Sequence, residues 1–73
     1  MTLSELKKFP LADDETRERI VNYIEGIPDP QTRQMFELHF LRGLSYRQVA
    51  EMLGGGMSRE CVHSRIARYN KNK

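Results

Sequence analysis

The residues best suited to chemistry are polar and basic side chains in the second half of the chain. They are Arg47, Ser58, Arg59, Glu60, His63, Ser64, Arg68 and Lys71. An arginine can donate two hydrogen bonds to the edge of guanine, and a glutamate can accept one from the amine of cytosine. Arginine and lysine also neutralise phosphates. We therefore expect this set to bind double-stranded DNA, with Arg59 and Glu60 at base edges. Arg68 and Lys71, further along the chain, are expected at phosphates.

A helix over residues 58–70 would place most of these side chains on one face. Val62, Ile66 and Tyr69 have the spacing of its buried stripe. The outward face then carries Glu60, His63, Ser64, Ala67, Arg68 and Lys71, with Arg59 beside it at the exposed N-terminal end. A purely structural role is an alternative explanation for these charges, because an acidic residue early in a helix and cations late in it interact favourably with the helix dipole.

Charge is distributed unevenly along the chain. Residues 1–41 hold five Lys/Arg and eight Asp/Glu, a net charge of −3, whereas residues 42–73 hold seven Lys/Arg and two Asp/Glu, a net charge of +5. A phosphate backbone attracts the second half and repels the first. This asymmetry favours DNA as a partner, although a solvated basic helix face would give the same count.

Catalytic, nucleotide-binding and metal-binding functions find little support. Cys61 and His63 are too closely spaced for a metal site, and no second pair of ligands completes one. The segment 54–58 lacks the lysine and the preceding strand of a nucleotide-binding loop. Its bare amides could still bind one phosphate, and an equally good alternative is a flexible turn in which Gly54 ends a helix. We expect no enzyme, no cofactor and no metal.

Length and composition limit the class of protein. A chain of 73 residues forms one domain and is too short to enclose a large active site. No window has the apolar length that spans a bilayer, and the first eight residues lack the features of a secretory signal. The single cysteine cannot form an internal disulfide, so we expect a reducing, cytoplasmic compartment.

Capping residues and periodicity predict an all-α fold, a small domain of about four helices without strands. The predicted helix starts are Asp13 or Asp14, Asp29-Pro30, Ser45 with Gln48, and Ser58. The predicted ends are Gly26 with Pro28, Gly43, and Gly54-Gly55-Gly56. Thr2 and Glu5 form a further capping box, which allows a short extra helix at residues 3–8.

Apolar residues at helical spacing predict the core. They are Ile20, Tyr23, Ile24, Ile27, Met35, Phe36, Leu38, Phe40, Leu41, Tyr46, Val49 and Leu53, with Ala50 at the edge of its arc. The helix that starts at Pro30 is apolar on two opposite sides, so we place it at the centre. We expect His39 to be a core-edge residue rather than a functional one, because nothing nearby orients it.

The segment Gly43-Leu-Ser-Tyr-Arg-Gln-Val-Ala-Glu-Met-Leu-Gly54, followed by Ser58-Arg-Glu-Cys-Val62, resembles the fourth conserved region of bacterial sigma factors. In that family a "G-L-S/T-x-x-E-I-A-x-x-L-G" helix precedes a recognition helix that begins "S/T-R-E-R-V". Residues 29–43 fit the same family, and the resemblance covers residues 27–70. This part of the chain is similar above all to short sigma-like proteins of phages and mobile elements in Gram-positive bacteria.

The resemblance implies a helix-turn-helix at 45–70 within a sigma-region-4-like part at 29–73, with residues 1–28 as supporting or dimerising helices. The family's base-contacting arginine and glutamate fall on Arg59 and Glu60, and a further contact falls on Ser64. Two departures could shift or rotate the recognition helix. Two extra glycines lengthen the turn, and Arg65 stands where the family has an apolar residue, with Ile66 one position later.

These observations together predict a sequence-specific DNA-binding regulator of transcription. The alternative is a protein-interaction module that docks on RNA polymerase or on a polymerase-bound factor. The chain is too short for the promoter-melting region of a complete initiation factor. We also expect a homodimer, because the stripe of Ile20, Ile24 and Ile27 would need more cover than one small chain provides, and a single recognition helix contacts few base pairs.

Overall fold

The computed structural model describes residues 1–71, in which helices are joined by short loops without any strand. In this part of the chain the α-helices are α1 (Leu3–Lys7), α2 (Asp14–Glu25), α3 (Pro30–Phe36), α4 (Tyr46–Leu53) and α5 (Arg59–Lys71). A 3-10 turn, η1 (Phe9–Leu11), follows α1, and a π-helical segment, η2 (Glu37–Leu41), extends α3. The all-α prediction is confirmed, and the extra N-terminal helix is present as α1.

The helices begin at the capping residues that the sequence predicted. Side chains cap α1, α2, α3 and α4 at Thr2, Asp13, Asp29 and Ser45. At α4 the box is reciprocal: the Ser45 hydroxyl accepts from the Gln48 amide at 3.1 Å, and Gln48 Oε1 accepts from the Ser45 amide at 2.9 Å. Such bonds satisfy amides that the first helical turn leaves without an intrahelical partner. The first helix of the predicted helix-turn-helix therefore has a fixed starting point.

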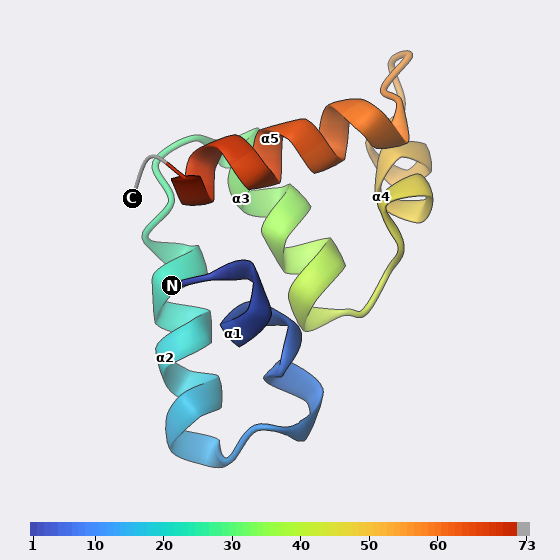
Figure 1. The fold of residues 1–73 in the computed structure, drawn as a ribbon. Helices are drawn as coiled ribbons and strands as arrows, with labels where there is room; N and C mark the ends of the chain where they lie inside the picture. Colours follow the sequence, from blue (N-terminus) through green and yellow to red (C-terminus); the bar gives the residue numbers. More distant parts are fainter. Residues whose placement is uncertain (72–73) are drawn as a thin grey trace.

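The continuous element of α3 and η2 lies at the centre of the fold, as its two apolar sides predicted. It contacts α2 and α5 through α3, and α4 and η1 through η2. Figure 1 shows α3 descending between α2 and α4, beneath α5. Phe36 is fully buried, and its ring lies 5.5 Å from those of Phe40 and Tyr69 and 6.4 Å from that of Tyr23. This aromatic cluster joins α2, α3 and the recognition helix.

The apolar stripe of α2 is covered by the chain itself. Ile20, Ile24 and Ile27 are fully buried, and Leu6 of α1 is buried in the same core. The expectation that this stripe needs a second copy for cover is therefore wrong. The sequence could not show this, because the cover comes from segments that only the fold brings together.

The end of the central helix differs from the uniform α-helix that the sequence predicted. The Arg42 amide donates to the Glu37 carbonyl at 3.1 Å, an i to i+5 bond that widens the last turn. Gly43 then has a φ of +73°, and the Leu44 amide donates to the Leu38 carbonyl at 3.1 Å. This pattern closes a helix C-terminus. His39 of this widened segment lies against Tyr46 of α4. Ala50 of α4 is buried rather than at the edge of the apolar arc.

Candidate nucleic-acid interface

The helix-turn-helix consists of α4, the glycine turn and α5, which pack against each other at one end of the molecule (Figure 1). Gly54, Gly55 and Gly56 all have positive φ values, of 66°, 64° and 79°. A Cβ added at any of them would meet no atom within 4 Å, so the turn projects away from the body of the protein. The two extra glycines are therefore accommodated in this projecting turn.

The recognition helix α5 has the rotation that its apolar spacing predicted. Val62 and Ile66 are fully buried, and Tyr69 packs against the core from a partly buried position. Arg65 lies at the side of the helix, where it donates a hydrogen bond to Gln31 and lies 3.8 Å from the Asp29 carboxylate. Arg65, which stands where the family has an apolar residue, thus contacts the start of α3. The helix α5 keeps its predicted inward face.

The predicted DNA-binding residues are all exposed. They are Arg47 on α4, Ser58 before α5, and Arg59, Glu60, His63, Ser64, Arg68 and Lys71 on α5. Ala67, which we expected on the same outward face, is half-buried instead. The predicted contact residues of α5 are therefore accessible along the helix, while Arg47 lies apart on α4.

The N-terminal end of α5 holds a preformed pair of opposite charges. Arg59 Nε lies 3.2 Å from Glu60 Oε1, and their side chains are 70% and 73% exposed. A backbone hydrogen bond at Glu60 itself, followed by the bond from Arg59, lowers the pKa of the Glu60 carboxyl, so it is ionised at neutral pH. Ser58 caps the helix, since its hydroxyl accepts from the Cys61 amide at 3.2 Å. Both side chains proposed for base edges therefore lie at a fixed helix start.

Arg47 on α4 is engaged by an acidic neighbour one turn away. Its Nε lies 3.3 Å from Glu51 Oε1, and both side chains are largely exposed. An exposed i, i+4 pair contributes only about 0.3–0.5 kcal/mol. A phosphate could therefore replace Glu51 as the partner of Arg47 at little cost.

A stack of three rings joins the recognition helix to the centre of the fold, and the sequence did not predict it. His39 lies parallel to Tyr46, with ring centroids 4.1 Å apart, and the Tyr46 ring meets His63 of α5 at 5.0 Å. His39 Nδ1 donates to the Leu44 carbonyl at 2.7 Å. The expectation that nothing nearby orients His39 is therefore wrong. The Leu44 carbonyl in the loop after η2 and the Tyr46 ring of α4 orient it.

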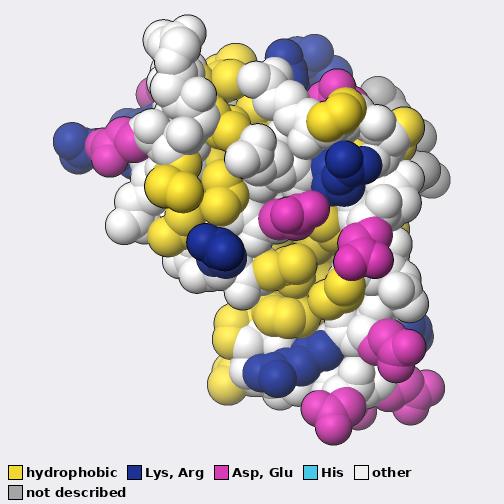
Figure 2. Space-filling model, turned by 180° about the vertical axis from the view of Figure 1, so that it is seen from behind, with side chains coloured by type: hydrophobic (Ala, Val, Ile, Leu, Met, Phe, Trp, Pro, Cys, Tyr) yellow, Lys and Arg dark blue, Asp and Glu magenta, His cyan; other side chains and the backbone are white. Residues whose placement is uncertain are grey.

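Most acidic side chains belong to the first half of the chain, while Glu51 lies on α4 and Glu60 on the recognition helix. Figure 2, turned by 180° from Figure 1, shows one group of acidic side chains over α2, at the end of the molecule opposite the glycine turn, and further acidic side chains higher on the same face. The basic residues of the second half lie mostly on or near α4 and α5, with Lys73 outside the described residues. The charge asymmetry of the sequence is thus also a spatial one, which would orient the molecule toward a polyanion.

An exposed, partly cationic recognition helix on a capped helix-turn-helix places the chain in the class of DNA-binding domains. The family model "Sigma-70, region 4" matches residues 17–68, and the chain belongs to that family. Its domains are non-enzymatic and bind DNA and the RNA polymerase core. No curated protein and no solved structure matches the chain.

Residues 1–71 contain neither a cluster of metal ligands nor a membrane-spanning helix. No group of three or more His, Cys, Asp or Glu side chains there could hold a metal ion. No helix in that part of the chain has the length and apolar character to cross a membrane.

Proposed function

We propose that this chain is a sequence-specific DNA-binding regulator of transcription whose recognition helix lies in the major groove. The observation that carries the proposal is the two-sidedness of α5. Val62 and Ile66 are fully buried, while the opposite face is exposed and polar, with cations toward both ends. A helix held in this way by its inner face can present its outer face to base edges.

The proposed roles follow from position along α5. Arg59 and Glu60 at its start contact base edges, and His63 and Ser64 lie one turn further along the same side. Arg68 and Lys71 near its end contact phosphates, as do Arg47 and the hydroxyl of Ser58 beside the groove. The phosphate contacts set affinity and the base contacts set sequence preference.

A second candidate function is docking on RNA polymerase. It is favoured by the family, whose domains bind the polymerase core, and by Met52 of α4, an apolar residue that is 61% exposed. The two functions are compatible, because Met52 does not belong to the proposed DNA-binding face.

We also propose a wider setting for the chain. The whole chain, 1–73, would be one domain, with residues 1–28 supporting the helix-turn-helix part at 29–73. It would act in a reducing cytoplasm, and the resemblance favours a phage or mobile-element origin. A homodimer is proposed only for a two-fold DNA site, because a single recognition helix contacts few base pairs. Sedimentation that gives one copy per duplex would rule the dimer out.

Selection of bound duplexes from a random pool tests the main proposal. Enrichment of a defined motif is expected from the unmodified chain. A variant carrying Arg59→Ala and Glu60→Ala should bind the same pool with a weakened motif, while Cys61→Ala, on the same helical turn, is the matched control. Binding that is salt-sensitive but enriches no motif would contradict sequence recognition and favour docking on polymerase.

A further inference from the structure

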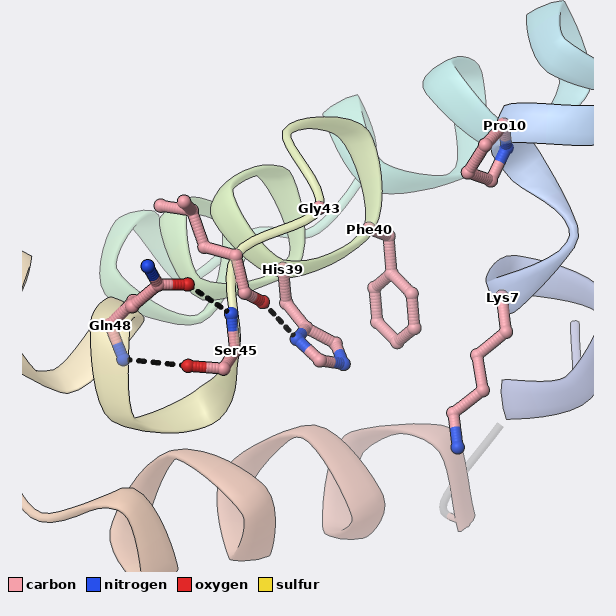
Figure 3. Close-up of a pocket in the computed structure, with 8 residues that line it drawn as sticks. Lys7, Pro10, His39, Phe40, Gly43, Ser45 and Gln48 are labelled. Atoms are coloured by element: carbon pink, nitrogen blue, oxygen red, sulfur yellow. Dashed lines mark hydrogen bonds between the residues drawn. The ribbon is translucent and has the colours of Figure 1, made fainter.

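A hollow of about 380 Å³ opens beside the helix-turn-helix, between α1, η2 and the start of α4 (Figure 3). Part of its wall is apolar, from Pro10 and Phe40, and part comes from Ser45 and Gln48 of the capping box. None of the described residues that line it is acidic. An anion in this hollow would therefore meet no like charge on its walls.

One nitrogen that faces the hollow belongs to His39, whose tautomer is fixed. Its Nδ1 lies 2.7 Å from the Leu44 carbonyl, and a carbonyl can only accept, so Nδ1 carries a proton. Nε2 is then the titrating atom. Figure 3 shows it on the side of the ring toward Phe40 and Lys7, and no hydrogen bond to it occurs among residues 1–71.

The second nitrogen is the ammonium group of Lys7. Figure 3 shows the Lys7 side chain extending from α1 past the Phe40 ring, which stands between it and His39 in this view. Lys7 is exposed, and no salt bridge engages it in the described part of the chain. Lys7 and His39 thus line one hollow that has no acidic side chain among its described lining residues.

We propose that this hollow binds a phosphate of the DNA backbone, with Lys7 Nζ and His39 Nε2 donating to its oxygens. The inference rests on the proposed function, because it extends the same DNA interface. Tyr46 connects the two parts: its ring stacks on His39 and contacts His63 of the recognition helix. Lys7 lies outside the residues matched by the family model, 17–68, so this contact belongs to the chain's own N-terminal segment.

Protonation of His39 should accompany phosphate binding. In the free protein, burial lowers the pKa of His39, the Leu44 bond opposes this, and the charges of Lys7 and His63 lower it further. The remaining titratable group packed against it is Tyr46, whose pKa is raised by burial, so it is neutral. A phosphate between Lys7 and His39 supplies negative charge, so the pKa of His39 should rise in the complex.

The test is DNA affinity as a function of salt for Lys7→Gln, with Lys8→Gln as the matched control. Lys8 is also exposed and basic, but it lines a different hollow beside Leu11 and Thr16. The logarithm of DNA affinity falls linearly with the logarithm of salt concentration, and we call the steepness of this fall the salt slope. Loss of one phosphate contact lowers the salt slope by about 0.9. The ratio of the unmodified protein's affinity to that of Lys7→Gln should therefore be about threefold smaller at roughly 200 mM salt than at roughly 50 mM salt. This change should be equal for every DNA sequence. Lys8→Gln should match the unmodified protein.

Histidine NMR provides the second measurement. A duplex should raise the pKa of His39 in the unmodified protein, and by less in Lys7→Gln. His39→Asn keeps a donor for the Leu44 carbonyl but removes Nε2, so it should weaken DNA binding while remaining folded by circular dichroism. An equal rise with inorganic phosphate alone at the same concentration would overturn the assignment to the DNA backbone.

Failure of this inference can be distinguished from failure of the proposed function. If Lys7→Gln and Lys8→Gln behave alike while Lys71→Ala still lowers the salt slope, only the Lys7 and His39 site is refuted. If the unmodified protein binds no duplex, both proposals fall together.

Discussion

Replacement of Arg59 by alanine should relax sequence preference, whereas replacement of Lys71 should weaken binding to every sequence alike. Arg59 opens α5 at the exposed end beside the glycine turn. Lys71 lies at the last residue of the same helix, about 18 Å further along its axis at about 1.5 Å per residue. A straight helix that contacts bases at its start leaves the groove floor over such a distance, so its end meets the backbone.

The structure sets the expected size of the Arg59 effect. Its side chain is 70% exposed and its only hydrogen-bond or ion-pair partner among the described residues is Glu60, so its loss should change stability by less than about 1 kcal/mol. The effect therefore falls on DNA binding. An arginine with two hydrogen bonds to guanine contributes about 1–3 kcal/mol of discrimination, roughly a 5- to 150-fold preference for one base pair.

The measurement is equilibrium binding of Arg59→Ala and Lys71→Ala to the selected duplex and to duplexes altered at single base pairs, at several salt concentrations. Arg59→Ala should lose the preference at one base pair, because no other side chain replaces the guanidinium. Lys71→Ala should lower the salt slope by about 0.9 and leave every preference intact. If both variants reduce binding to all duplexes by the same factor, Arg59 does not contact a base and the assignment of α5 positions is wrong.

Other predictions concern the fold that supports the interface. Phe36→Ala should lower the free energy of unfolding by about 3–5 kcal/mol in urea denaturation, because the ring is fully buried among three aromatic rings; a change below about 1 kcal/mol would contradict the central position of α3. Gly43→Ala should cost about 1–2 kcal/mol through backbone strain alone, since φ is +73° and a Cβ would meet nothing within 4 Å. Burial lowers the pKa of His39 below its ordinary 6.5, so the unfolded chain takes up its proton first as the pH falls. The free energy of unfolding should therefore fall below about pH 6.5, and by less in His39→Asn; equal pH dependence in both proteins would refute this.

Local sequence signals predicted the helices well because their physical causes are local. Ser45 and Gln48 form their capping box within one helical turn, and Val62 and Ile66 share a face through helical spacing alone. The widened turn of η2 was not predicted, since an i to i+5 bond depends on how the end of the helix packs and closes. The cover over the Ile20 stripe was also missed, for it comes from segments distant in the sequence.

The sequence by itself determined the all-α class, the helix-turn-helix and the outward set of residues on α5, because caps and periodicity act over a few residues. Only the tertiary structure decided which contacts the polar residues beside the core make. Arg65 contacts the start of α3, His39 is held between the Leu44 carbonyl and the Tyr46 ring, and Lys7 reaches the hollow beside it. The Arg65 and Lys7 arrangements join residues far apart in the chain, and the His39 contacts depend on how the chain turns after η2. Their distances follow from the packing of helices rather than from spacing along the sequence.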